Sequence, residues 1–268
     1  MGPLSVGFGL EGAVVTLADG RQLAVKARAR GACGSSLTLE AYMLGELERL
    51  SDLPVPHVHY ANDDLLVMDY IATDGGITRS VERHAGALIA GLHAAKRARF
   101  GYARDTLIGP LHQPNPESDR WVPFFRDYRL LHMARAAHDE GLLPASLLAR
   151  IVHLAERIEQ HLIEPEHPSL LHGDLWTGNV LVRGGKVAAF VDPAIYCGHP
   201  EIELAFATLF GTFGADFFAS YQERLKLQPG FFEERRDIYN LYPRLVHVRL
   251  FGSGYLAGIA ATLRKVGH

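Results

Sequence analysis

The spacing of apolar residues divides the chain into a strand-rich beginning and a helix-rich remainder. The segment AVVTLADGRQLAVKARA alternates around Asp19-Gly20, a dipeptide that favours a hairpin turn. HVHYANDDLLVMDYI holds a second pair of strand-like runs, and between the two pairs LEAYMLGELERL places its leucines and methionine on one helical face. These patterns predict a small sheet with one inserted helix.

From residue 80 onward the hydrophobic period changes from two to about 3.6. The first helical stripe contains Val81, Ala85, Leu88, Ile89, Leu92 and Ala95. Further helices are predicted around 121–131, 147–162, 201–224 and 232–265, and a hairpin with Gly184-Gly185 at its turn lies among them. We therefore predict an α+β protein with a β-rich lobe at residues 1–72 and a larger helical lobe at residues 73–268.

Composition narrows the class of protein. The chain has 268 residues, of which 48% are hydrophobic, and a net charge of −3, which does not favour binding to nucleic acid or to an anionic membrane. No apolar run is long enough to span a bilayer, and no secretion signal is evident. Cys33 and Cys197 are far apart, so a disulfide framework is not expected. We therefore expect a cytoplasmic location. A redox role for Cys33 stays open.

The segment LLHGDLWTGNVLVRGGKVAAFVDPA carries the most specific chemical pattern. Asn179 follows Asp174 by five residues, and Asp192 follows after an intervening hairpin, at the end of a strand. This is the order of a protein-kinase catalytic loop and its metal-binding aspartate, so it predicts a bilobal protein-kinase-like fold. Asp174 would take the proton of an acceptor hydroxyl, while Asn179 and Asp192 would bind Mg²⁺. A single Asp-x-x-x-x-Asn is more often turn chemistry; the joint pattern is more specific.

Upstream residues fit a site for ATP. Lys26 lies on a predicted strand and Glu40 at the start of the inserted helix, the positions of the lysine and glutamate that pair in protein kinases. Taken separately, Lys26 is more simply a surface residue of a strand. Glu40 is more simply an acid at the start of a helix, where the helix dipole favours it. The strand LLVMDYI would lead into a hinge between the lobes. There the backbone groups of Asp69, Tyr70 and Ile71 would contact adenine, and Met68 would lie beside the adenine ring. The glycines in SVGFGLEG do not have the protein-kinase spacing.

Several motifs together resemble the fructosamine kinase (ketosamine 3-kinase) family, within the aminoglycoside-phosphotransferase-like branch of the kinase fold. They are HGDLWTGN, DPA, GHPEIELAFATLFG and YPRLVHVRLFGSGY. The resemblance begins near residue 20 and is weakest in the first fifteen residues. It implies ATP- and Mg²⁺-dependent phosphorylation of the 3-hydroxyl of a ketosamine, free or as a glycated lysine, which leads to deglycation. It also implies that Asp174 is the base, that Asn179 and Asp192 are metal ligands, and that Lys26 with Glu40 positions the phosphates.

Two residues are candidates for contact with the substrate. Trp176 is the residue that best separates this family from aminoglycoside and choline kinases, and its ring could pack on a sugar or brace the loop. Glu203, with Glu201, could attract a cationic amine, although a helix-start anchoring role is the simpler interpretation. The alternatives are a kinase for another small molecule, such as an aminoglycoside, choline or a sugar, and a nucleotide-binding pseudokinase. The sequence does not indicate the oligomeric state.

Overall fold

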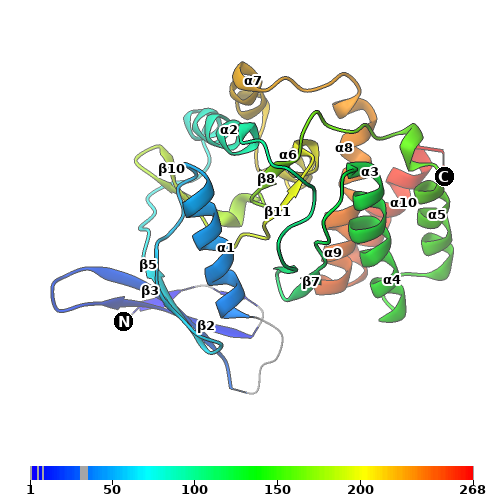
Figure 1. The fold of residues 1–268 in the computed structure, drawn as a ribbon. Coiled ribbons are helices and arrows are strands. Elements are labelled where there is room, and N and C mark those ends of the chain that lie inside the picture. The colour runs from blue at the N-terminus through cyan, green and yellow to red at the C-terminus, as the bar shows by residue number, and fades with distance from the viewer. Residues whose placement is uncertain (1, 5, 8, 31–35, 268) are drawn as a thin grey trace.

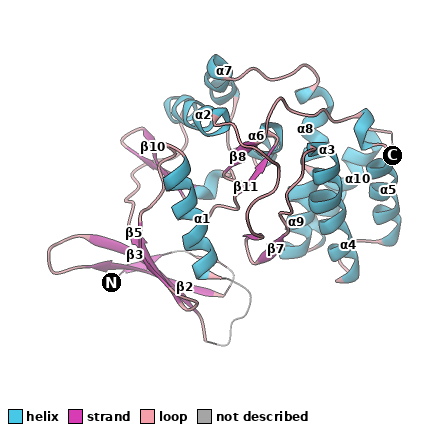
Figure 2. Ribbon diagram, in the orientation of Figure 1, coloured by secondary structure: helices cyan, strands magenta, loops and turns pink. Residues whose placement is uncertain are grey.

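The protein was analysed as a computed structural model that describes residues 2–4, 6–7, 9–30 and 36–267. Five antiparallel strands form one sheet in the order β1-β2-β3-β5-β4. Their bounds are β1 (Gly2–Leu4), β2 (Leu10–Thr16), β3 (Gln22–Arg28), β4 (Val58–Ala61) and β5 (Leu65–Asp69). Helix α1 (Leu37–Leu50) packs beside this sheet, which stands apart from the remaining helices (Figures 1 and 2). The α+β class predicted from the sequence is confirmed.

The hairpin between β2 and β3 forms where the sequence predicts it. Thr16 pairs with Gln22, and Gly20 has φ +86°, a left-handed conformation that glycine adopts without a steric penalty. The Asp19 carboxylate accepts a hydrogen bond from the backbone N–H of Arg21 at 3.0 Å. The turn therefore fixes the register of β3, which carries Lys26 opposite Gly12.

Helix α1 contacts two hydrophobic cores. It begins after Ser36, whose hydroxyl accepts a hydrogen bond from the N–H of Leu39 at 3.2 Å. Leu37 and Leu44 pack in a small core with residues of the sheet, whereas Met43 and Leu47 belong to the main core of the helical part. Because one helix contributes to both cores, the position of Glu40 is fixed relative to both parts of the molecule.

The rest of the chain is mainly helical, with three short two-stranded sheets (Figure 2). The strands are β6 (Thr106–Ile108), β7 (Leu111–Gln113), β8 (Ser169–Leu171), β9 (Val180–Arg183), β10 (Lys186–Phe190) and β11 (Tyr196–Gly198). The α-helices are α2 (Arg79–Ala94), α3 (Trp121–Phe125), α4 (His132–Asp139), α5 (Ala145–Glu156), α6 (Pro200–Leu209), α7 (Ala215–Arg224), α8 (Arg236–Tyr239), α9 (Leu241–Phe251) and α10 (Leu256–Lys265). Shorter helical turns are η1 (Arg126–Leu131), η2 (Ile158–Gln160), η3 (Thr177–Asn179), η4 (Phe231–Arg235) and η5 (Ser253–Tyr255).

The C-terminal helices are shorter than their hydrophobic pattern predicts. The expected helix at 201–224 is broken between α6 and α7, where Gly211 has φ +64°. The expected helix at 232–265 is divided at several points, one of them Gly252 with φ +86°. Apolar periodicity continues across these glycines because both flanking helices face the same core, so the period alone does not reveal the breaks.

Three further expectations have different outcomes. In the described part of the chain, no helix has the length and apolar character needed to cross a membrane. Cys197 is a buried free thiol, while Cys33 lies outside the described residues. The domain boundary at residue 72 stays a prediction.

Candidate functional site

A cavity of about 450 Å³ lies between the sheet and the helical part and gathers most of the predicted site residues. The sheet and α1 contribute Lys26 and Glu40, and the long loop around β9 and β10 contributes Asp174, Asn179 and Asp192. The other lining residues are Val6, Gly7, Leu10, Ser36, Met43, Leu107, Gly109, Trp176, Gly178 and Pro193. Segments that are far apart in the sequence thus form a single pocket with both polar and apolar lining residues.

Lys26 is held between two carboxylates at one wall of this cavity. Its side chain is almost completely buried, and its Nζ donates a hydrogen bond to Glu40 Oε1 at 2.7 Å. Nζ also contacts Asp192 Oδ1. Burial alone would lower the pKa of Lys26, but the charges of Glu40 and Asp192 outweigh it, and the pKa is raised. The ammonium group therefore stays charged at neutral pH, as binding to phosphate oxygens requires.

Gly12, within β2, allows a close backbone contact beside the cavity. Gly12 lies opposite Lys26 in the β2–β3 pair, and a Cβ there would come within 2.4 Å of the carbonyl oxygen of Leu4. The absence of a side chain at Gly12 thus permits its close pairing with Leu4 of β1, and Val6 and Gly7 line the cavity. A protein-kinase glycine spacing is not needed for that contact.

The loop after β8 places Asp174 and Asn179 side by side. The Nδ2 of Asn179 donates hydrogen bonds to Asp174 Oδ2 at 2.8 Å and to the Asp174 carbonyl oxygen at 2.9 Å. Two backbone hydrogen bonds tie this loop to the segment between β10 and β11: Val191 N–H donates to Asn179 O at 3.0 Å, and Ala194 N–H donates to His172 O at 2.8 Å. These bonds hold Asp192 against the same loop.

The electrostatic surroundings of Asp174 favour proton uptake. Burial raises its pKa to about 7, and the charges of Asp192 and Glu203 act in the same direction, against the hydrogen bond from Asn179. A carboxylate with a pKa near neutrality is suited to accept a proton at physiological pH. The predicted role of Asp174 as a general base stays a prediction that this raised pKa agrees with.

Asp192 adopts an unusual backbone conformation, with φ +52°. It is the only non-glycine residue with positive φ among the described residues, and such strain often accompanies functional sites. Its side chain remains about half exposed, although its neighbours are mostly buried. The carboxylate is thereby presented to the cavity.

The donor set fits a magnesium ion bound together with phosphate. Mg²⁺ in nucleotide sites takes one or two protein oxygen ligands and completes its shell with phosphate oxygens and water. Asp192 offers a carboxylate. Because the Nδ2 of Asn179 donates to Asp174, the Oδ1 of Asn179 is the atom available to a cation. Among the described residues no group of three or more His, Cys, Asp or Glu side chains could hold a metal, and binding of Mg²⁺ by Asn179 and Asp192 stays a prediction.

None of the residues predicted to contact adenine lines this cavity. Met68 is buried in the small core with Ala24 and Leu66. The N–H groups of Asp69 and Tyr70 donate to the carbonyls of His57 and Gln22, at 3.0 and 3.4 Å. Neither these residues nor Ile71 lines the cavity described above, so their contact with adenine stays a prediction.

Trp176 and Glu203, the two predicted substrate contacts, lie in very different surroundings. Trp176 borders the cavity and is 39% exposed. Glu203 is 3% exposed, and its carboxylate accepts hydrogen bonds from the N–H groups of His172 (3.3 Å) and Gly173 (2.5 Å) and contacts His93 Nε2 at 2.8 Å. A carboxylate engaged in this way is not offered to a substrate. Glu203 instead anchors the backbone that carries Asp174.

His93 is a supporting residue that the sequence did not reveal. Its Nδ1 contacts the hydroxyl of Tyr221 at 3.0 Å, and its ring is completely buried. On the helical stripe of α2 it has the position of a core residue, so its sequence context gives no sign of a link to the catalytic loop. Only the tertiary contact with Glu203 shows it.

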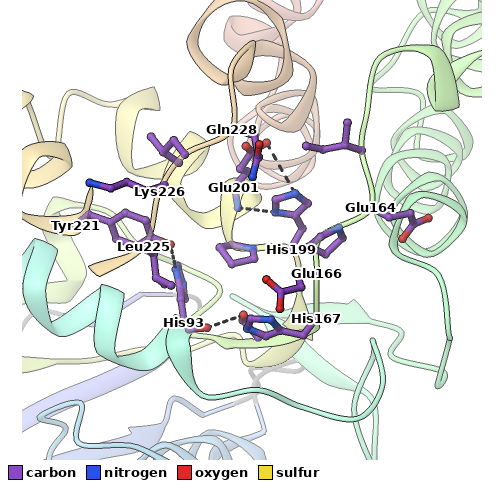
Figure 3. A pocket seen from close by; sticks show the side chains of 15 residues that line it. His93, Glu164, Glu166, His167, His199, Glu201, Tyr221, Leu225, Lys226 and Gln228 are labelled. Atoms are coloured by element: carbon purple, nitrogen blue, oxygen red, sulfur yellow. Dashed lines mark hydrogen bonds and ion pairs between the residues drawn. The ribbon is translucent and has the colours of Figure 1, made fainter. Parts of the chain in front are cut away.

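A second cavity, of about 510 Å³, is lined in part by His93 and Tyr221 (Figure 3). His199 and Glu201 also line it, and Glu201 is bound by the guanidinium of Arg235 at 2.6 and 2.7 Å. Asp174, Asn179 and Asp192 do not line this cavity. The two cavities are therefore lined by different groups, and only the first contains the predicted catalytic and metal-binding residues.

Comparison with known proteins agrees with this geometry. A family model described as fructosamine kinase matches residues 7–267. The chain belongs to the fructosamine kinase family. A "probable ketoamine kinase" of Synechocystis sp. is 36% identical over 75% of this chain and 67% of its own length. A chloroplastic protein-ribulosamine 3-kinase of Arabidopsis thaliana is 33% identical over 83% of this chain and 68% of its own length.

Solved structures of this family have the same fold. The crystal structure of a fructosamine-3-kinase candidate from Thermobifida fusca has a TM-score of 0.90 at 31% identity, covering 98% of this chain and 91% of its own. An aminoglycoside phosphotransferase solved with ADP and hygromycin B has a TM-score of 0.67 at 16% identity, covering 99% and 94%. That likeness shows the fold alone. The predicted kinase-like architecture and the family resemblance are both confirmed.

Proposed function

We propose that this member of the fructosamine kinase family is an ATP-dependent kinase that phosphorylates the 3-hydroxyl of ketosamines. The observation that carries the proposal is the meeting of Lys26, Glu40 and Asp192 with Asp174 and Asn179 at one cavity. Turnover requires a carboxylate oriented at this cavity, as Asp174 is by Asn179, whereas a nucleotide-binding protein without turnover has no need of one. The match to the fructosamine kinase family and to ketoamine kinases supports a ketosamine as the acceptor.

Each side chain has a role in this reaction. The acceptor hydroxyl forms a bond to the γ-phosphorus, the bond from that phosphorus to the β,γ-bridging oxygen breaks, and ADP leaves with the electron pair. The hydroxyl proton passes to Asp174, whose carboxylate is oriented by Asn179. Lys26 positions the phosphates, and Glu40 positions Lys26. Asn179 and Asp192 would hold Mg²⁺, which supplies charge neutralisation for the phosphates.

The product implies a further consequence for the acceptor. A phosphate at carbon 3 of a ketosamine is a good leaving group beside a carbonyl, so the adduct decomposes and the amine is released. The protein would thus act in deglycation. Trp176 supports recognition of a sugar, because its ring is exposed at the cavity beside Asp174.

The decisive experiment is incubation with Mg-ATP and a panel of acceptors. The panel contains fructosyl-, ribulosyl- and erythrulosyl-lysine together with an aminoglycoside, choline and free fructose, and NMR locates the phosphate. We expect ADP release and a 3-phosphate with at least one ketosamine. Turnover of the aminoglycoside or of choline alone would assign the protein to a different substrate class, and no turnover at all would indicate a pseudokinase.

A further inference from the structure

A buried hydrogen-bond network joins the hairpin of β6 and β7 to the segment that follows Asp192. Its centre is Thr106 in β6, whose side chain is completely buried. The Thr106 hydroxyl accepts hydrogen bonds from Gln113 Nε2 at 2.8 Å and from Asn115 Nδ2 at 2.7 Å. It donates one to the carbonyl oxygen of Ile195 at 3.1 Å. A hydroxyl has one proton and two lone pairs, so the capacity of this hydroxyl is fully used.

The two amides that meet this hydroxyl are also held by other partners. Gln113 Nε2 donates to the carbonyl oxygen of Ala194 at 3.0 Å, and Gln113 Oε1 accepts from the Tyr242 hydroxyl at 2.7 Å. Asn115 Oδ1 accepts from Arg129 Nη2 at 2.6 Å. Each amide oxygen meets a donor and each amide nitrogen meets acceptors, so turning either amide over would break several bonds. The network therefore favours one arrangement.

Arg129 anchors this network in the helical part. It lies in η1, a π-helical turn, and such turns are frequent at functional sites. Its guanidinium is completely buried, and Nη1 donates to the carbonyl oxygen of Pro114 at 2.8 Å. Its Cζ lies 3.9 Å from the centroid of the Tyr196 ring and 4.8 Å from that of Phe124. Because a buried charge is costly without such partners, these contacts hold Arg129 in place, and Asn115 with it.

The network fixes the backbone just after Asp192. Ala194 and Ile195 are the second and third residues after Asp192, and their carbonyl oxygens are the acceptors at this end of the network. The N–H of Ala194 donates to His172 O, in the loop after β8, at 2.8 Å. Ala194 is therefore bonded through its N–H to the loop of the predicted catalytic residues and through its carbonyl to Gln113.

The hairpin also reaches the cavity and helix α1. Leu107 and Gly109 line the cavity, and β6 contacts α1, the helix that carries Glu40. Glu40 and Asp192 are the two carboxylates that hold Lys26. The hairpin thus contacts both of the elements on which the position of Lys26 depends.

We propose that Thr106 is a positioning residue, which keeps the Asp192 carboxylate in the place where it serves Mg-ATP. The inference rests on the proposed function, because Mg-ATP is the phosphoryl donor in that reaction. Asp192 has φ +52°, a strained conformation that persists only where its surroundings enforce it. The carbonyls of Ala194 and Ile195, bonded to the network, provide that constraint. Without the Thr106 hydroxyl the backbone can relax, and the carboxylate can move away from Lys26 and from a cation.

The test uses substitutions that remove or keep one buried hydroxyl. Thr106→Val replaces the hydroxyl by a methyl group of similar size, whereas Thr106→Ser keeps the hydroxyl. Tyr239→Phe is the matched control, because it also removes a buried hydroxyl from a hydrogen bond, in this case with Trp121 Nε1 at 2.9 Å. Neither Tyr239 nor Trp121 lines the cavity.

Calorimetry measures the Kd of a non-hydrolysable ATP analogue, once with Mg²⁺ and once with EDTA, for wild type and each variant. The ratio of the Kd in EDTA to the Kd in Mg²⁺ expresses what the metal adds to nucleotide binding. Steady-state ADP release with a ketosamine gives kcat, and thermal unfolding gives the loss of stability. The ratio is the decisive measurement, because a residue with a merely structural role would not change it.

We expect Thr106→Val to lower both this ratio and kcat about tenfold, the usual effect of losing a group that orients a metal ligand. The Kd in EDTA should hardly change, because Lys26 stays paired with Glu40. Thr106→Ser should keep the ratio and kcat near their wild-type values. Tyr239→Phe should lower the melting temperature and leave the ratio unchanged.

A ratio in Thr106→Val equal to that in Tyr239→Phe would overturn the proposal, and so would equal losses in Thr106→Val and Thr106→Ser. If Thr106→Val does not fold, Tyr242→Phe decides instead, because it removes only the donor to Gln113 Oε1 from the same network. A lowered ratio in Tyr242→Phe would then support the proposal, and an unchanged ratio would overturn it.

Failure of the proposed function gives a different result. If wild type phosphorylates no ketosamine, the proposed function falls, but the calorimetric ratio still tests Thr106 because it requires no turnover. If wild type transfers phosphate to a ketosamine and the ratio does not depend on residue 106, only the Thr106 proposal falls.

Discussion

At the scale of single residues, Asp174 is the group whose removal tests the chemistry most directly. We predict that Asp174→Ala and Asp174→Asn lower kcat by about 10²–10⁴, the usual contribution of a general base. The Asn variant keeps an oxygen that can accept the hydrogen bond from Asn179, so its loop should remain in place. Steady-state ADP release measures turnover, and calorimetry measures nucleotide binding.

Nucleotide affinity is the control in this experiment, because Lys26 and Asp192 are untouched. We expect it to change by less than about threefold. Turnover within tenfold of wild type would contradict the base assignment, and a parallel loss of nucleotide binding would indicate that the loop has collapsed.

Glu203 permits a prediction about pH at the same scale. Burial alone would raise its pKa, but the hydrogen bond and charge of His93, with further help from His172 and Gly173, lower it overall. A carboxyl group whose folded-state pKa is lowered contributes stability above its ordinary pKa and loses it as pH falls through the folded value. We therefore expect the free-energy difference between wild type and Glu203→Gln to be constant from pH 7 to about 5 and to shrink below pH 4.5.

Urea unfolding at pH 7, 5 and 4 measures that difference. Glu166→Gln is the control, because the Glu166 side chain is 83% exposed and should show little difference at any pH. A difference for Glu203→Gln that is the same at pH 4 as at pH 7 would contradict the assigned contacts.

At the scale of elements, the contact between the loop after β8 and the segment between β10 and β11 depends on Gly173. Its φ is +87°, and a Cβ would lie 2.0 Å from the carbonyl oxygen of Ala194. We predict that Gly173→Ala lowers the free energy of unfolding by about 2 kcal/mol or more, because backbone strain and a backbone clash act together. For a protein of this size the melting temperature should fall by roughly 4–8 °C.

Gly184→Ala is the matched control for backbone conformation. Gly184 also has positive φ, at +58°, but nothing lies within 4 Å of its added Cβ. Its loss should be limited to about 1 kcal/mol. Equal losses in the two variants, measured by thermal unfolding, would show that the approach of Ala194 is unimportant.

Elements that depend on local sequence were predictable, and those that depend on distant contacts were not. The turn at Asp19-Gly20 and the hairpin at Gly184-Gly185 follow from backbone conformations that glycine favours. The spacing of Asp174, Asn179 and Asp192 indicated one site because a single loop and hairpin connect them. The anchoring role of Glu203 depends on helix α6 packing behind that loop, which no local pattern expresses.

At the scale of the whole molecule, the cavity joins parts that otherwise have separate hydrophobic cores. Glu40 lies on α1, which contributes to both cores, and Lys26 crosses from the sheet to Asp192. A ligand that contacts both walls binds the folded form only. Nucleotide binding should therefore stabilise the two parts together rather than one of them.

The last prediction uses this linkage to test the metal as well as the nucleotide. At a concentration one hundred times its Kd, Mg-ATP should add about 2.7 kcal/mol to the free energy of unfolding. The melting temperature should then rise by roughly 5–10 °C. ATP with excess EDTA should give a much smaller rise, because the carboxylate of Asp192 then faces the phosphates without a cation between them.

Asp192→Ala should remove most of the dependence on Mg²⁺ while keeping part of the response to ATP, because Lys26 remains paired with Glu40. Differential scanning fluorimetry of both proteins, with and without EDTA, measures these shifts. An equal rise in wild type with and without the metal would show that Asp192 and Asn179 do not hold a cation with the nucleotide.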